Sequence, residues 1–205
     1  MMDFEKVEVK SREELRAWLA ENAEAFGRSI WLVTFKKGRG PSVSYDDIVE
    51  EAICFGWIDS RVAKLDDDRT MLLLSPRRAS SSWSAVNKQR VEKLLEQGLI
   101  TPRGLSMIEQ AKASGAWDRL NEVDALIEPD DLKSALTATA FAMENWNLMA
   151  ASSRRGILEW IGAAKRPETR AERVERTAQL AGKGLKANFP DGRNRIAGAI
   201  GPKTA

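Results

Sequence analysis

The residues best suited to binding chemistry lie just before a predicted helix. Arg77 and Arg78 are followed by a run of serines and by Trp83. Guanidinium groups bind phosphate or carboxylate through paired hydrogen bonds, and the free amides at a helix N-terminus favour an anion. The pattern therefore predicts a site for a small anion, with Trp83 available for stacking. An alternative of comparable weight is a serine N-cap together with structural ion pairs from the arginines to Asp59 or residues 66–68.

Residues on neighbouring predicted elements extend this candidate site. Trp57 and Asp59 lie at a helix-to-strand junction, where a tryptophan usually packs against the core but can also form one wall of a pocket. Arg61 and Lys64 follow Asp59 in the same predicted strand, and the amide side chain of Asn87 lies one helical turn beyond Trp83. The predicted ligand-binding residues are Trp57, Asp59, Arg61, Lys64, Arg77, Arg78, Ser82, Trp83 and Asn87.

Composition excludes several kinds of catalytic and metal site. The chain of 205 residues contains no histidine, which removes both an imidazole base and histidine-ligated zinc. Its single cysteine, Cys54, cannot form an internal disulfide or a multi-cysteine metal site. Cys54 also falls late in its predicted helix, at a position that fits packing in the core, and both features disfavour nucleophilic chemistry. We therefore expect no catalytic residue, no metal and no cofactor, and a binding role is favoured over an enzymatic one.

Charge is distributed unevenly along the chain. Residues 1–149 hold 20 Lys and Arg against 25 Asp and Glu, whereas residues 150–205 hold 12 against 5. A basic C-terminal region can attract nucleic acid, but interleaved glutamates and the lack of interleaved aromatic residues favour a solvated helix face. No charge-free run approaches the roughly 20 residues of a membrane span, and the N-terminus lacks a secretory apolar region. We expect a cytoplasmic location and no membrane span.

Hydrophobic periodicity and capping signals predict an α+β fold. Strand-like runs at residues 30–35, 58–65 and 70–74 indicate a small, mostly antiparallel β-sheet, in which the last two runs form a hairpin. Helices flank this sheet and make up a helical C-terminal part. Predicted helices cover residues 11–27, 45–55, 83 or 84 to 97, 101–115, 129–145, 152 or 153 to 164, and 167–182. The predicted division is an α+β domain at residues 1–125, a helical subdomain at 126–187 and a flexible tail at 188–205.

Two ordered groups of motifs carry a resemblance to a known family. The first group lies within residues 45–117, and the second lies near the C-terminus. Their most specific strings are Glu51-Ala52-Ile53-Cys54-Phe55-Gly56-Trp57-Ile58-Asp59-Ser60, Ser75-Pro76-Arg77-Arg78, Ser82-Trp83-Ser84, Thr101-Pro102-Arg103-Gly104-Leu105 and Trp160-Ile161-Gly162-Ala163-Ala164-Lys165-Arg166-Pro167-Glu168-Thr169-Arg170. With these motifs the chain resembles the YdeI/OmpD-associated family, also called bacteriocin-protection proteins, over most of its length, from about residue 30 to about residue 185.

The resemblance implies a role in tolerance of bacteriocins and cationic antimicrobial peptides, and by name a link to an outer-membrane porin. It supplies no reaction, cofactor or catalytic residue. The first hypothesis is a cytoplasmic protection or stress-response protein that binds a small anionic ligand or a protein partner. The second is an enzyme acting on a phosphorylated or carboxylated metabolite, with Asp59 as acid or base. The third is weak nucleic-acid binding through the basic C-terminal helix that carries Arg166, Arg170 and Arg173.

Overall fold

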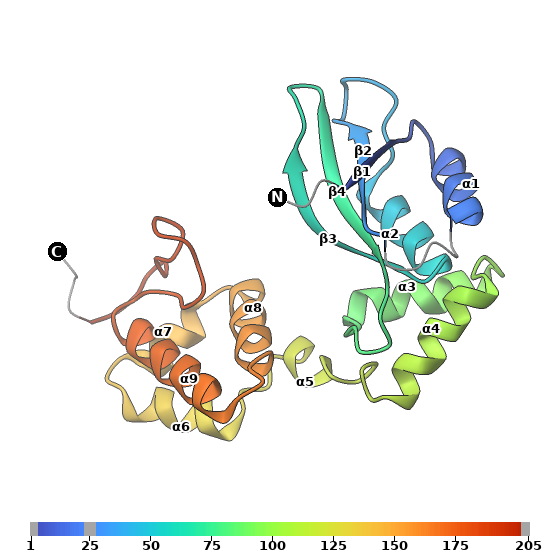
Figure 1. Ribbon diagram of the computed structural model, residues 1–205. Coiled ribbons are helices and arrows are strands. Elements are labelled where there is room, and N and C mark those ends of the chain that lie inside the picture. The colour runs from blue at the N-terminus through green and yellow to red at the C-terminus, as the bar shows by residue number, and fades with distance from the viewer. Residues whose placement is uncertain (1–3, 23–27, 202–205) are drawn as a thin grey trace. The chain divides into compact units, whose positions relative to one another are not determined.

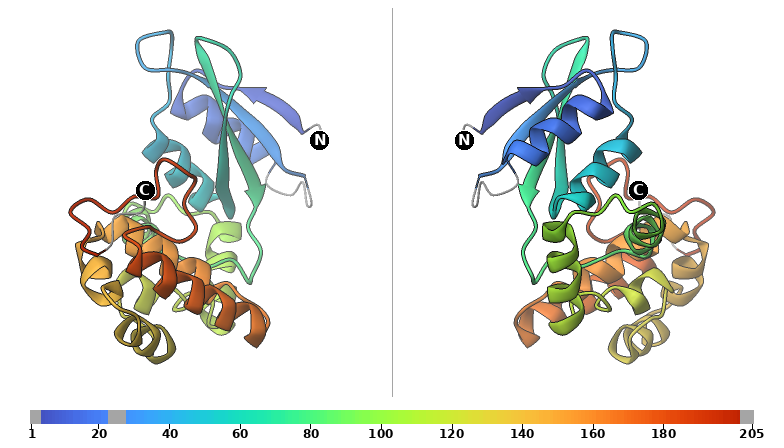
Figure 2. Two further views of the ribbon diagram at one scale, coloured as in Figure 1. Left: turned by 90° about the vertical axis from the view of Figure 1, so that its left-hand side faces the viewer. Right: turned by 90° about the vertical axis from the view of Figure 1, so that its right-hand side faces the viewer.

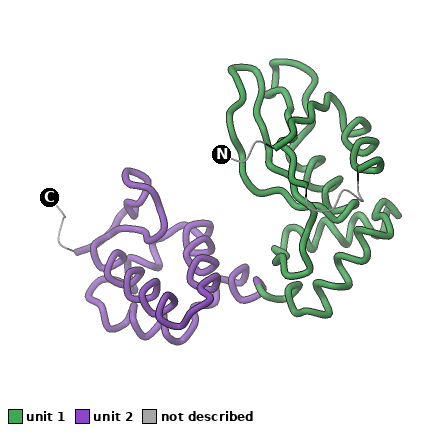
Figure 3. The backbone as a smooth tube through the Cα atoms, in the orientation of Figure 1, with its two compact units in different colours: residues 1–119 green, residues 120–205 purple. Residues whose placement is uncertain are grey.

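The chain folds into two compact units, Met1–Arg119 and Leu120–Ala205 (Figure 3). A computed structural model describes residues 4–22 and 28–201. The end that was predicted for the first helix, at Gly27, lies outside the described residues. Each unit has its own cluster of buried apolar side chains. We therefore describe the two units separately.

A mixed four-stranded sheet is the centre of the described part of the N-terminal unit (Figure 1). Its strand order is β1-β2-β4-β3, with β1 parallel to β2 and the other neighbours antiparallel. The predicted hairpin is confirmed, because β3 pairs with β4 along most of its length. The strands are β1 (Glu5–Glu8), β2 (Ile30–Phe35), β3 (Trp57–Lys64) and β4 (Arg69–Pro76). Together with the flanking helices they confirm the predicted α+β class.

The helices of this unit begin at the predicted polar caps. Side-chain oxygens of Ser44, Ser84 and Thr101 each accept a hydrogen bond from the amide three residues ahead, which satisfies one free donor of the first helical turn. The helices are α1 (Arg12–Asn22), α2 (Tyr45–Cys54), α3 (Ala85–Glu96) and α4 (Pro102–Ala113). Figures 1 and 2 show α1 and α2 on one face of the sheet.

The core of the N-terminal unit lies between this helical layer and the sheet. Leu32 and Leu74 come from adjacent strands, and Leu15 and Leu19 come from α1; all four are fully buried. The ring of Trp57 is also fully buried and packs edge-on against Trp18, with 5.9 Å between the ring centroids. Trp57 is therefore a core residue at the start of β3.

A buried ion-pair network joins α1 to α2. Glu51 is only 1% exposed and accepts hydrogen bonds from Arg12 Nε at 2.7 Å and from Arg16 at 2.8 Å. Its neighbour Glu50 is nearly as buried and accepts from Lys93 on α3 at 2.7 Å. Separating a buried carboxylate from its arginines would leave an uncompensated charge. This network therefore disfavours other arrangements of α1 against α2.

The C-terminal unit is helical in its described part. Its helices are α5 (Asn121–Asp124), α6 (Asp130–Ala138), α7 (Ala142–Leu148), α8 (Ala151–Gly162) and α9 (Pro167–Gly182). They enclose a core in which Leu132, Trp146 and Ile157 are fully buried. Among the residues that the structure describes, no helix has both the length and the apolar character needed to cross a membrane.

The single helix predicted at residues 129–145 is wrong, because the chain forms α6 and α7 there instead. Phe141 adopts a left-handed conformation, with φ of 62°, and so interrupts the helix. Gly182 lies beside this break: a Cβ atom at Gly182 would lie 2.9 Å from the carbonyl oxygen of Ala140. The break therefore lies at a tertiary contact, which helix periodicity does not record.

The segment after α9 packs onto the C-terminal unit rather than leaving it. Ile196 is buried in the core of this unit. The buried side chain of Asn145 donates to the carbonyl oxygens of Ala181 and Ile200, and accepts from the amide of Ile200 at 2.8 Å. The tail predicted to be loose from residue 188 is therefore held by specific hydrogen bonds up to Ile200.

At the junction of α2 with α4 the two backbones approach each other closely. The carbonyl oxygen of Cys54 accepts hydrogen bonds from Thr101, from its amide at 3.0 Å and from its hydroxyl at 2.7 Å. A Cβ atom at Gly104 would overlap this same carbonyl oxygen and lie 2.8 Å from Ile100 Cγ2. The glycine is therefore required for α4 to begin where it does.

We predict that Gly104→Ala lowers the free energy of unfolding by about 2–3 kcal/mol, because the added methyl group must push α4 away from Cys54. The matched control is Gly156→Ala in α8, where nothing lies within 4 Å of the added Cβ. Alanine should stabilise that helix interior by up to about 1 kcal/mol. Urea unfolding of both variants measures the two changes. Equal effects of the two substitutions would contradict the proposed steric role of Gly104.

Candidate anion-binding site

A cavity of about 350 Å³ lies between the end of β4 and the first turns of α4. Its lining combines cationic, polar and apolar side chains. The described lining residues are Arg77, Arg78, Arg103, Ser29, Ser75, Gln110, Pro76, Ala79 and Met107. Three of them are arginines and none is a carboxylate. We call this space the arginine cavity.

The motif at the start of β3 places the arginines together. Gly56 adopts a left-handed conformation, with φ of 72°, as predicted for the end of its helix. Its carbonyl oxygen accepts a hydrogen bond from the amide of Arg77 at 2.9 Å. A Cβ atom at Gly56 would lie 2.9 Å from Met107 Cγ and 3.4 Å from the carbonyl oxygen of Arg103. Because Gly56 lacks a side chain, the start of α4 can approach it closely, while its carbonyl oxygen binds the end of β4.

Arg77 is the most unusual residue of the cavity. It is only 4% exposed, and its guanidinium carbon lies 3.7 Å from the centroid of the Trp83 ring. One terminal nitrogen donates to the carbonyl oxygen of Ser82 at 3.1 Å, whereas the buried Nε has no hydrogen-bond partner among the described residues. Buried cations are normally paired with a carboxylate. Within the described residues Arg77 lacks such an ion pair.

Burial makes the charge on Arg77 costly. It lowers the pKa of Arg77 to about 10, well below the usual value for arginine, and the negative charge of Asp59 opposes part of this effect. The shift corresponds to about 3 kcal/mol by which the fold disfavours the cation. Arg77 nevertheless stays protonated at neutral pH. A strongly perturbed charge in a cavity is a physical marker of a binding site.

The remaining polar groups of the cavity can donate to an anion. The hydroxyl groups of Ser29 and Ser75 lie 2.7 Å apart and share one hydrogen bond, so one of the two protons is left for another acceptor. Arg78 is exposed, and its backbone amide donates to Ser81 Oγ at 3.3 Å. Gln110 donates one amide proton to Ser106 and keeps a second. The cavity therefore offers hydrogen-bond donors on several sides.

The predicted alternative, ion pairs from the arginines to nearby aspartates, is not what the described residues form. Asp59 accepts a hydrogen bond from the hydroxyl of Tyr45 at 2.7 Å. Burial and this carboxylate raise the pKa of Tyr45 to about 12. Asp66 pairs with Arg69 at 2.7 Å. The serine N-cap of that alternative does exist, at Ser84.

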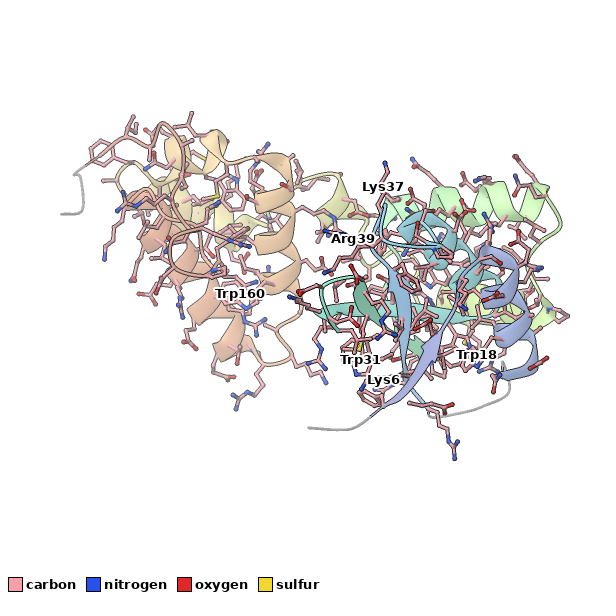
Figure 4. All side chains as sticks on the ribbon, turned by 90° about the horizontal axis from the view of Figure 1, so that it is seen from above. Lys6, Trp18, Trp31, Lys37, Arg39 and Trp160 are labelled. Atoms are coloured by element: carbon pink, nitrogen blue, oxygen red, sulfur yellow. The ribbon has the colours of Figure 1, made fainter. Side chains whose placement is uncertain are left out.

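Seven of the nine predicted site residues do not line the arginine cavity, and five of these seven make their contacts elsewhere in the N-terminal unit. Trp57 belongs to the core, and Asp59 faces Tyr45. Arg61 lies over the ring of Trp31 at 5.3 Å, on the part of the sheet where Figure 4 labels Trp31 and Lys6. The other two are Lys64, which pairs with Asp67 at 2.6 Å, and Asn87, which accepts a hydrogen bond from Arg90.

The other four predicted residues either line the cavity or contact Arg77, which lines it. Arg77 and Arg78 line it. Ser82 and Trp83 hold the guanidinium of Arg77 through a carbonyl oxygen and an aromatic ring. The prediction missed the contributions of Arg103, Ser29, Ser75 and Gln110. In the sequence, Arg103 stands between Pro102 and Gly104, in a motif that was interpreted only as the start of a helix. That position was the one available sign of its role.

Two family models match separate parts of the chain. Residues 125–184 match the family described as "Bacteriocin-protection, YdeI or OmpD-Associated". Residues 7–107 match a domain of unknown function, DUF8412. No curated protein and no solved structure shows a significant match. The predicted resemblance is thus confirmed in the C-terminal region, whereas most of the first group of motifs lies in the stretch that the second model matches.

We predict that Arg77→Met changes the free energy of unfolding by less than about 1 kcal/mol. Removing the buried charge relieves about 3 kcal/mol, while the lost cation–π contact and hydrogen bond cost about 2 and about 1 kcal/mol. The matched control is Arg12→Met, which takes a partner from buried Glu51 and should cost about 3 kcal/mol. Urea unfolding compares the two. Equal destabilisation would mean that Arg77 serves the fold rather than a ligand.

Proposed function

We propose that this protein, whose residues 125–184 form a domain of the bacteriocin-protection, YdeI or OmpD-associated family, binds a small anionic ligand in the arginine cavity of its N-terminal unit. We propose further that this binding contributes to bacteriocin protection. The observation that carries the proposal is a buried cation, Arg77, in a cavity whose described lining contains three arginines and no carboxylate. The cytoplasm, predicted from the sequence, remains the proposed place of action.

Energetics favour a ligand over a purely structural role for the cavity. An unpaired buried cation lowers stability, and such costs are retained mainly where function needs the charge. An incoming anion would pair with Arg77 and would accept from its Nε, which has no other described partner. Ligand binding would therefore remove a penalty that the free protein carries.

Binding is favoured over turnover by the chemistry of the lining. The described lining residues include no carboxylate, lysine, tyrosine or cysteine, which are the usual proton-transfer groups where histidine is missing. Asp59, the acid or base of the enzyme hypothesis, contacts Tyr45 instead of lining the cavity. Arginine clamps, hydroxyl groups and an amide suit recognition of an anion.

The basic helix α9 gives less support to nucleic-acid binding. Arg170 pairs with Asp131 at 2.7 Å. Arg173 lies over the ring of Trp160, at 4.9 Å from its centroid, and donates to the carbonyl oxygen of that residue. Two of the three arginines on the predicted face are thus engaged within the C-terminal unit. A ligand site in the N-terminal unit is the better supported proposal.

The test is a thermal-shift panel of phosphates, nucleotides, acidic metabolites and cell-wall fragments. A ligand at about 100 times its Kd adds about 2.7 kcal/mol of stability, which raises Tm by roughly 5–10 °C. The cavity variant is Arg78→Gln/Arg103→Gln, and the matched control is Arg61→Gln, an exposed arginine outside the cavity. We expect a ligand that shifts the wild type and the control by the same amount and the cavity variant by less than half as much. A silent panel at millimolar concentration, or an equal shift in all three proteins, would overturn the proposal.

The link to protection has a separate test in the host. We expect cells that express the Arg78→Gln/Arg103→Gln variant to lose bacteriocin tolerance, while cells with Arg61→Gln keep it. Immunoblotting of the folded, soluble protein controls for abundance. Unchanged tolerance at equal abundance would separate anion binding from protection and would leave only the binding part of the proposal standing.

A further inference from the structure

We propose that the C-terminal unit carries a surface that binds an anionic lipid membrane from one side. The surface consists of exposed apolar side chains on α7 and on the segment after α9, with cations beside them. We call it the α7 patch and define it by Phe141, Leu148 and Ile200. The arginine cavity belongs to the other unit, so the α7 patch would be a second binding site.

The three apolar side chains of the α7 patch are held next to one another. Asn145 follows Phe141 by four residues and precedes Leu148 by three, so it lies between them on one face of α7. Asn145 is fully buried, donates to the carbonyl oxygen of Ile200 at 2.9 Å and accepts from its amide at 2.8 Å. Phe141, Leu148 and Ile200 are nevertheless 43%, 49% and 46% exposed. Large apolar side chains gathered at the surface mark an interaction site.

The fold itself fixes the ring of Phe141 at the surface. With φ of 62°, Phe141 adopts a left-handed conformation that is rare for a bulky residue. Its ring lies close to the backbone of Gly201, where an added Cβ atom would come within 3.1 Å of Phe141 Cδ2. Strained conformations of this kind persist where the surrounding structure imposes them, and they cluster at functional sites.

Unpaired cations lie beside the apolar side chains. Residues 183–201 hold four Lys and Arg against one Asp, and Figure 1 shows this segment running back past α7. Lys183 follows Gly182, whose carbonyl oxygen would lie 3.4 Å from the same added Cβ atom at Gly201. The carboxylate of α7 is Glu144, which is exposed. The cations that are exposed and form no ion pair with a described residue are Lys183, Arg193 and Arg195.

This combination fits an anionic bilayer better than a protein partner. Protein interfaces are depleted in lysine, and their apolar centres exclude charge. Apolar side chains accompanied by lysine and arginine are typical of surfaces that lie at a membrane interface. The cations attract anionic headgroups within about a Debye length, and the apolar side chains then enter the boundary with the acyl chains. Both contributions are needed, because either one alone gives only weak attachment.

The test is co-sedimentation of the full chain with two kinds of lipid vesicle. One kind is phosphatidylcholine alone, and the other contains about one third phosphatidylglycerol, which is anionic. We expect the anionic vesicles to bind at least about 10-fold more tightly than the neutral ones. Raising the salt concentration from about 0.1 M to about 0.5 M should weaken this binding, because it shortens the Debye length.

Single substitutions assign the binding to the α7 patch. Phe141→Asn keeps a residue type that tolerates the left-handed conformation and should weaken binding about 10-fold, while Lys183→Gln should weaken it about fivefold. Glu144→Gln removes a repelling charge and should tighten binding by up to about fivefold. The matched controls are Ile127→Asn, at an apolar side chain that is 54% exposed between α5 and α6, and Lys133→Gln, at an exposed lysine of α6. Both controls should bind as the wild type does, and circular dichroism verifies that every variant is folded.

Three results would overturn this proposal. The first is no binding to anionic vesicles, or equal binding to both kinds. The second is binding that Phe141→Asn and Lys183→Gln leave at the wild-type level, since another surface, such as the arginine cavity, would then hold the headgroups. The third is a chain that ignores vesicles but changes its self-association when Phe141 is replaced, which would make the α7 patch a protein interface. Each leaves the thermal-shift test of the arginine cavity unaffected, because that test uses soluble ligands and variants of the other unit.

Discussion

The hydrogen bonds that the carbonyl oxygen of Cys54 accepts from Thr101 are the constraint on which the N-terminal unit depends. They join the end of α2 to the start of α4, and they require a glycine at position 104 so that the two backbones can touch. Two residues beyond Cys54, Gly56 turns the chain into β3 and contacts both Arg103 and the amide of Arg77. One junction therefore closes the fold and brings together arginines from distant parts of the sequence.

The unit balances its electrostatics in two different ways. Between α1 and α2, buried Glu51 is paired with two arginines, so its charge is compensated within the fold. At the arginine cavity the opposite holds, because Arg77 is buried against Trp83 without a described ion pair. The first arrangement specifies how helices pack. The second leaves a buried positive charge that, among the described residues, only Asp59 offsets in part, and this is the physical basis for proposing a ligand at this place.

The two matched families divide the chain in much the same way as its folding units. The bacteriocin-protection match covers residues 125–184, within the helical unit, whereas the arginine cavity belongs to the unit that contains residues 7–107. Motif strings that were interpreted together as one family signature thus have separate structural roles. Those of the N-terminal unit build the α2–α4 junction and the cavity. The C-terminal string spans the end of α8 and the start of α9.

The sequence by itself determined the α+β class, the hairpin of β3 and β4, the polar caps and the candidate role of Arg77 and Arg78, because these depend on local patterns of residue type and spacing. It excluded imidazole chemistry through composition alone. Only the tertiary structure decided that Arg103, Ser29 and Ser75 join the cavity, that Arg61 and Lys64 do not, and that residues 129–145 form two helices. The physical reason is the same in each case. Contacts between residues far apart in sequence arise from strand register, helix docking and close backbone approach, and local periodicity carries no record of them.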